Sequence, residues 1–542
     1  MIDRWEKYFR LIVLLFAVGC YCSNSHAQDA LLDGLGGDDD TEQAADEEEA
    51  APPTQDDFLD LGFGPSRPQL SPEEEQEVKS NIARLTQEAA AAKDQGNLDQ
   101  ALLKYDEVLP ELAKVQEPTV SFNVLFDRGK ILREQGYVQE AIRAFTAATE
   151  FVANVEDKDA VRQNYIEMGQ LYLETEQYNT AISIFQGALT LPGESRSAEL
   201  LFNLGYAQSE FALNQQYARA EETQEGLERA ILSYDRAIAV DPNYAEAYYE
   251  RGTTSLILGE RDKAMDDLKE SLELDPNNEE AVAQFGFASL NRALSEGSKH
   301  NGQRAKIIDD LNIAVAQLSR YLQLVPEPDP DAEVEEEEEP EIKRENVLLQ
   351  RSAAYIELGS ESLTGGSDYY KKAIEDAEAV VELIPEAPDG FYQKGLAYRM
   401  LGDFPSALEA FDETLRISPG NTQARFRRGI IHFRQGDYQL ALADLKKAQQ
   451  FSVGGINPPA AFWEGLCHSR MGQHRYAVNA YSAALRYQSL YTSAYLNRGI
   501  AYMKLGRYQR AEADFNEVLG QDRNNSLARS LRDQIQPLIS KR

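Results

Sequence analysis

The sequence predicts an all-α solenoid, a stack of helical hairpins, because one pattern of residues recurs at a fixed interval. Between Pro388 and Asn525 the chain divides into blocks of 34 residues, one of them two residues longer. Each block has a glycine, an alanine twelve positions later, and a large apolar residue four positions after that. The glycines are Gly395, Gly429, Gly465 and Gly499; the alanines are Ala407, Ala441, Ala477 and Ala511; the large residues are Phe411, Leu445, Tyr481 and Phe515.

Each block has the apolar spacing of two amphipathic helices joined by a tight turn. In the first block, Phe391, Gly395 and Tyr398 recur at helical intervals before Gly402-Asp403 interrupts the run. A second helix then continues to Pro419, which ends it. A single hairpin cannot bury its apolar face alone, so consecutive hairpins are expected to stack.

The period and the pattern of small, aromatic and proline residues resemble those of the tetratricopeptide repeat, or TPR. The resemblance implies a right-handed α-solenoid, and weaker copies of the pattern bring the total to about eleven helix-turn-helix units. We expect about six units in residues 82–326 and about five in residues 345–525. An acidic loop at residues 327–344 separates the two arrays, and a capping helix at residues 526–542 follows the second.

Residues 1–27 have the features of an export signal. Arg4, Lys7 and Arg10 precede an apolar core, and Ser25-His26-Ala27 offers small residues for cleavage. We therefore expect an exported bacterial protein, periplasmic or secreted, with no stable membrane insertion after cleavage. Two alternatives stay open: a lipoprotein attached through Cys20, and an anchor formed by an uncleaved signal.

Residues 28–81 are rich in acidic residues, glycine and proline, a composition that predicts a disordered segment. Within it, Phe58 to Phe63 form an apolar island flanked by acids. The island is either chance variation in a linker or a short docking motif. In the second case we hypothesise that the segment docks on the basic C-terminal repeats of its own chain or of a neighbour, which would be self-association. Phe58, Leu61 and Phe63 would supply the apolar anchors. The acidic residues would meet basic ones: Asp56, Asp57 and Asp60 on one side, and Arg399, Arg434 and Arg470 on the other.

Charge divides the chain unevenly. The whole sequence has a formal net charge of −37, yet residues 388–542 contain 21 Lys and Arg against 13 Asp and Glu, a net of +8. With +1 for the signal, residues 28–387 carry −46. This acidity argues against a nucleic-acid partner, which requires clustered basic residues.

No pattern of catalytic or metal-binding residues emerges. The sequence lacks His-Glu-x-x-His, Gly-x-Ser-x-Gly and a phosphate-binding Gly-Lys-Ser/Thr loop. Cys467, His468 and His474 fall short of a four-ligand zinc site, and packing explains them more simply. The sequence therefore predicts neither an enzyme nor a cofactor or metal site.

The TPR resemblance implies a partner-binding groove on the concave side, lined by first-helix residues. The positions that match are Tyr392, Arg399, Phe426, Phe433, Arg434, Phe462, Arg470, Leu496 and Lys504. Aromatic residues with arginines beside them suit a peptide with apolar anchors and carboxylates. The alternative is that several of them pack between neighbouring repeats. The family's lysine-asparagine clamp is not seen, because its lysine position holds an aromatic residue or Leu496.

The function predicted from the sequence is a non-enzymatic scaffold or adaptor of the cell envelope that binds a protein or peptide. Two alternatives remain: a permanent structural component of an envelope assembly, and an accessory subunit of a separate enzyme. Large exposed apolar patches on the convex helices would favour the structural component.

Overall fold

The computed structural model describes residues 70–193, 197–214, 220–297, 304–325, 342–362, 365–455, 457–489 and 491–539. The predicted signal at 1–27, the apolar island at 58–63 and nearly all of the acidic loop lie outside these ranges. Among the described residues, no helix combines the length and the apolar character needed to cross a membrane.

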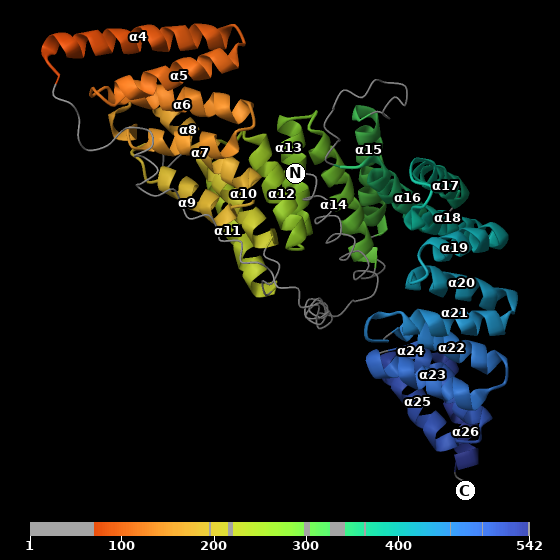
Figure 1. The fold of residues 1–542 in the computed structure, drawn as a ribbon. Helices are drawn as coiled ribbons and strands as arrows, with labels where there is room; N and C mark the ends of the chain where they lie inside the picture. The colour runs from red at the N-terminus through yellow and green to blue at the C-terminus, as the bar shows by residue number, and fades with distance from the viewer. Residues whose placement is uncertain are drawn as a thin grey trace, which may run out of the picture. The chain divides into compact units, whose positions relative to one another are not determined.

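The described residues form 23 α-helices, about eleven helical pairs (Figure 1), which confirms the predicted all-α solenoid. In the first compact unit, up to Asn291, the helices are α4 (Pro72–Asp94), α5 (Leu98–Leu112), α6 (Pro118–Glu134), α7 (Val138–Thr149), α8 (Lys158–Glu174), α9 (Tyr178–Ala188), α10 (Ala198–Asn214), α11 (Ala220–Val240), α12 (Ala245–Ile257), α13 (Arg261–Leu274) and most of α14 (Glu279–Gly297).

The second compact unit starts at Arg292 and contains the end of α14 and the remaining helices. These are α15 (Arg304–Leu324), α16 (Arg344–Glu361), α17 (Gly366–Leu383), α18 (Pro388–Leu401), α19 (Phe404–Ile417), α20 (Thr422–Gln435), α21 (Tyr438–Gln450), α22 (Pro458–Arg470), α23 (His474–Tyr487), α24 (Thr492–Lys504), α25 (Tyr508–Gln521) and α26 (Ser526–Ile539).

The chain becomes helical earlier than the sequence pattern indicates. We expected disorder up to residue 81, but α4 begins at Pro72. Ser71 caps this helix in a capping box: its hydroxyl accepts from the Glu74 amide at 3.3 Å, and Glu74 accepts from the Ser71 amide at 2.7 Å. The acidic residues of the first turn suit the positive end of the helix dipole, so they belong to the helix and not to the segment before it.

The repeat glycines lie where the two helices of a pair meet. A Cβ atom added at Gly395 would lie 2.7 Å from the Phe411 ring, and one at Gly499 would lie 2.7 Å from the Phe515 ring. The Phe411 and Phe515 side chains are fully buried. The glycine therefore provides the space that the aromatic side chain of the second helix fills. A tight turn joins the two helices of a pair; Gly402 and Gly436, for example, cap the first helices α18 and α20 in the left-handed conformation.

Candidate functional site

The first helices of successive repeats lie next to one another in the second unit. α16 contacts α18, and the same relation links α18 to α20, α20 to α22 and α22 to α24. All nine residues predicted to line a groove belong to α18, α20, α22 and α24. Stacking therefore places them on a common row of helices, which we call the first-helix face.

The predicted residues at the fifth position of the repeat pack mainly between helices. Phe426 is only 7% exposed. The Tyr392 ring lies 5.9 Å from that of Phe411, and the Phe462 ring lies 4.9 Å from that of Tyr491. Leu496 packs against the cluster that contains Phe515. These side chains support the first-helix face, and a partner would find little of Phe426 to contact.

A second aromatic group surrounds Phe433 on α20. Its ring meets Trp463 edge-on at 5.2 Å and lies 5.4 Å from Tyr438. The guanidinium of Arg470 lies over Phe433, 5.9 Å from the ring centre. Arg470 is exposed, whereas Phe433 and Trp463 are half-buried. Sequence reasoning missed Trp463, the residue that joins Phe433 to the next repeat.

Three arginines form a cationic cluster: Arg399 on α18, and Arg427 and Arg434 on α20. None of them has an ion-pair partner within the ranges that the structure describes. The Nε atoms of Arg399 and Arg427 are buried without a hydrogen-bond partner there. Arg399 donates only a weak hydrogen bond, from Nη2 to the Met400 sulfur at 3.4 Å. Burial, and then the charges of Arg427 and Arg434, lower the pKa of Arg399, so the three guanidinium groups are close enough to repel one another.

Glu357 on α16 is an acidic neighbour of this cluster. Burial raises the pKa of its carboxyl, while the charges of Arg427 and Arg399 act in the opposite direction. Its carboxylate accepts from the Ser360 hydroxyl at 3.5 Å. Glu357 thus offsets part of the positive charge without forming an ion pair with any of the three arginines. Two of the cluster's arginines were among the predicted residues; Arg427, at the sixth position of its repeat, was not.

The remaining predicted cation, Lys504, is exposed at the last residue of α24. The first-helix face therefore combines a cationic cluster on α18 and α20 with half-buried aromatic side chains and two exposed cations, Arg470 and Lys504. These groups suit recognition of an acidic segment with apolar side chains.

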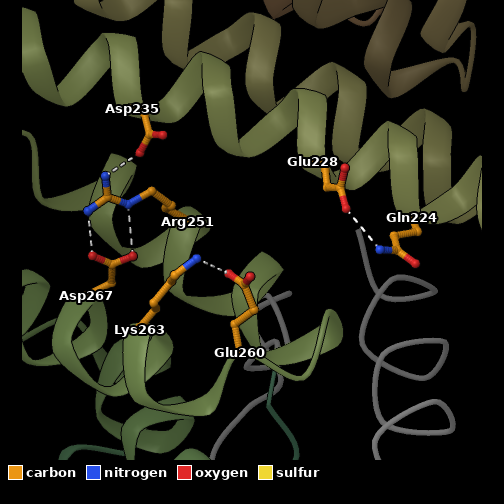
Figure 2. A network of polar contacts seen from close by, with 7 residues as sticks. All are labelled: Gln224, Glu228, Asp235, Arg251, Glu260, Lys263 and Asp267. Atoms are coloured by element: carbon orange, nitrogen blue, oxygen red, sulfur yellow. Dashed lines mark hydrogen bonds and ion pairs between the residues drawn. The ribbon is translucent and has the colours of Figure 1, made fainter.

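Other charged residues in the repeats are structural, as the network around Arg251 shows (Figure 2). Arg251 on α12 donates from Nε and Nη2 to Asp267 on α13 at 2.9 and 2.6 Å, and from Nη1 to Asp235 on α11 at 2.6 Å. One side chain therefore ties together the two helices of its own repeat and the second helix of the preceding one. Equivalent forks join Arg292 to Asp310, Arg351 to Asp376, Arg428 to Asp444 and Arg498 to Asp514.

The first unit contains a small charged cavity of about 390 Å³. It is lined by Lys93, Lys130, Ile131, Arg133, Glu134 and Glu167. Most of its charges are already paired: Lys93 Nζ donates to Asp127 at 2.8 Å, and Arg133 donates to Glu167 and to Glu174. This internal pairing makes the cavity a weaker candidate for a binding site than the cationic cluster.

Cys467 lies in the interior of α22, fully buried. Burial, and then the charge of Glu464, raise the pKa of its thiol to about 12. His468 is hydrogen-bonded through Nδ1 to Gln473 at 2.7 Å. Within the described residues, no three potential ligands are grouped so that they could hold a metal ion.

The geometry defines a class, the helical-hairpin repeat proteins, and the family models identify the repeat. Tetratricopeptide-repeat models match residues 163–194, 245–278, 367–422, 392–455 and 464–526, and a further TPR model matches residues 224–254. The chain therefore contains tetratricopeptide repeats in both of its units.

The relatives share the repeats over part of their length. The chain is 22% identical to mouse DnaJ homolog subfamily C member 7 over 306 residues, which cover 53% of this chain and 62% of that protein. It is 29% identical to the TPR repeat-containing protein MJ1428 of Methanocaldococcus jannaschii over 161 residues, 28% of this chain and 27% of that protein. The chain thus spans less than two thirds of either relative.

Two solved structures match the chain at low sequence identity and with low TM-scores. Yeast Tom70 is 12% identical, with a TM-score of 0.39, and the match covers 85% of this chain and 99% of Tom70. YrrB, a TPR protein with an unusual peptide-binding site, is 19% identical with a TM-score of 0.28, over 34% of this chain and 92% of YrrB.

Proposed function

We propose that this protein is a non-enzymatic scaffold that binds a segment of another protein on the first-helix face of its second unit. The observation that supports this most directly is the cationic cluster, whose guanidinium groups lack carboxylate partners within the described residues. Arg434 is exposed, whereas Arg399 and Arg427 are partly buried, and the buried Nε atoms of these two have hydrogen-bonding capacity that an acidic ligand would satisfy. TPR families typically act as interaction scaffolds and not as enzymes, in agreement with this function.

The proposal includes export: the scaffold would work in the cell envelope, as a periplasmic or secreted protein. Its support is the sequence of residues 1–27, with a basic start, an apolar core and a small-residue cleavage site. The intact mass of the protein recovered from an envelope fraction tests this step. A chain that begins at Gln28 is expected; a diacylglycerol mass on Cys20 would instead indicate a lipoprotein.

One observation favours the alternative of a permanent structural component. The second helices of two adjacent repeats expose large apolar residues at equivalent positions: Leu440 on α21 is 55% exposed and Tyr476 on α23 is 63% exposed. Phe451, which caps the end of α21, and Tyr487, the last residue of α23, also occupy equivalent positions, and both are about half exposed. In a permanent assembly this surface would be covered, whereas a scaffold that binds on the first-helix face does not require it.

The experiment that tests the scaffold is affinity capture with the full chain from an envelope extract, followed by mass spectrometry. Arg470→Glu with Lys504→Glu reverses two exposed charges on the first-helix face, so capture of the partner should fall at least tenfold. The control is Arg475→Glu with Arg486→Glu, which reverses two exposed charges on α23. A partner lost with the control but kept with the first pair would place binding on the second helices and contradict the proposal.

A further inference from the structure

The spacing within the cationic cluster limits what it binds. Arg427 and Arg434 are seven residues apart on α20, which is about 10 Å along the axis at 1.5 Å per residue. Arg399 on the neighbouring helix α18 interacts electrostatically with both of them. The two side chains are thus attached about two helical turns apart on one face of α20, an arrangement that suits two anionic groups on one ligand better than a single phosphate or carboxylate.

A peptide in the polyproline II conformation meets that requirement. It has three residues per turn and a rise of about 3.1 Å, so side chains three residues apart project from one side, about 9 Å apart. Two acidic residues at this interval match the two arginines of α20. With Glu357 ionised, the three arginines also leave two net positive charges, which two peptide carboxylates would neutralise.

We propose, building on the proposed function, that Arg399, Arg427 and Arg434 bind a pair of carboxylates three residues apart, and that Asp57 and Asp60 of this same protein supply them. Asp57-Phe58-Leu59-Asp60 has the required interval, with apolar residues between the acids. These residues lie outside the described ranges. The assignment rests on the interval and on charge complementarity between this acidic segment and the basic repeats from Pro388 onward.

The occupant is therefore a segment of the chain itself, and the first-helix face binds it in competition with other acidic partners. The sequence pattern alone suggested Arg399, Arg434 and Arg470 for this contact. In the structure, Arg427 and Arg434 act electrostatically on Arg399, so Arg427 takes the place of Arg470 in this contact.

The test uses the full chain with its own acids neutralised, Asp57→Asn with Asp60→Asn, and a labelled peptide of residues 51–68. The peptide should bind saturably, and more weakly as salt rises from 0.05 to 0.5 M, about the range over which screening becomes strong. Adding Arg399→Gln, Arg427→Gln and Arg434→Gln should weaken binding at least tenfold. The matched control, Arg475→Gln with Arg486→Gln and Arg507→Gln, removes the same charge from exposed positions and should leave affinity unchanged.

Two further measurements make the result decisive. The peptide carrying both Asn substitutions should lose binding, and this arm stands even if the arginine variant folds poorly. The unmodified chain should bind the wild-type peptide more weakly than the neutralised chain does, because its own segment competes. If that competition grows with protein concentration, a second copy supplies the segment; if it is independent of concentration, the same molecule does.

Several outcomes would overturn the proposal. If the peptide does not bind saturably at millimolar concentration, or binds equally well to the arginine variant, the cationic cluster is not the binding site. If the unmodified and neutralised chains bind the peptide with equal affinity, the chain's own segment does not occupy the cluster. If inorganic phosphate displaces the peptide more strongly than sodium chloride does at the same ionic strength, the cluster is a phosphate site and not a site for paired carboxylates. Loss of peptide binding with normal partner capture refutes this inference alone, whereas loss of capture with normal peptide binding refutes the proposed function alone.

Discussion

The surroundings of Cys467 determine the protonation state and the reactivity of its thiol. It lies in α22 two residues after Gly465, whose added Cβ would collide with the Tyr481 ring of α23. Burial raises the pKa of the thiol to about 12, so the fold favours the protonated form. The thiol therefore packs as a small apolar group, and its nucleophilic thiolate is suppressed.

The burial of Cys467 predicts that its thiol is protected from alkylation in the folded chain, and that the thiol's contribution to stability depends on pH. Because the folded pKa is above that of an unfolded cysteine, about 8.5, the thiol contributes stability that is fully present below that value and lost as pH rises toward 12. With Cys20→Ser and Cys22→Ser, iodoacetamide at pH 8.5 should alkylate the folded chain at least ~100-fold more slowly than the unfolded chain. Intact mass over time measures the two rates; equal rates would contradict the buried placement.

At the scale of the helices, arginine–aspartate forks hold the repeats together. Arg428 on α20 donates to Asp444 on α21 at 2.8 and 2.6 Å and to Asp412 on α19 at 2.6 Å. Hydrogen bonding to Asp444 raises the pKa of Arg428 despite its burial. Asp444 is only 5% exposed, whereas Asp412 is exposed. The two halves of the fork should therefore differ in energy.

Removing the arginine is expected to cost more than removing the outer aspartate. Arg428→Met leaves the Asp444 carboxylate buried and unpaired, at a cost of about 3–5 kcal/mol, while Asp412→Asn costs about 0–1 kcal/mol. Arg428→Met combined with Asp444→Leu should recover much of the loss. Hydrogen exchange in α20 and α21 measures these local stabilities. If Arg428→Met and Asp412→Asn reduce local stability by similar amounts, then the loss of Arg428 does not leave an unpaired buried charge on Asp444.

The helical pairs could be predicted because their determinants lie close together in sequence. Gly395 and Phe411 contact each other within one block, and the period repeats that contact. The forks had a readable signal too, since Arg428 and Asp444 are sixteen residues apart, as are Arg251 and Asp267. The cationic cluster had no such signal. Arg427 comes near Arg399 only because α18 and α20 are stacked, and the repeat pattern does not specify the charges carried on that face.

At the scale of the molecule, the chain consists of two compact units, one ending at Asn291 and the other starting at Arg292. Inside each unit, the extensive contacts join a helix to its nearest neighbours along the chain. Stability in such an array is approximately the sum of the repeats and of the interfaces between neighbours. Damage to one repeat should therefore weaken the adjacent repeats most and fade with distance.

Gly465→Leu tests this behaviour, because the added side chain has no space beside the Tyr481 ring. Overpacking of this kind costs about 1–3 kcal/mol, and displacement of a fully buried tyrosine adds to it. Hydrogen exchange should show the largest loss of protection in α22 and α23, a smaller loss in α20, α21, α24 and α25, and none in α4 to α13. The control Arg475→Gln, on the exposed side of α23, should leave all segments unchanged. Uniform loss of protection across both units would mean that the array unfolds as one cooperative body, and neighbour-by-neighbour coupling would then fail as a description of this solenoid.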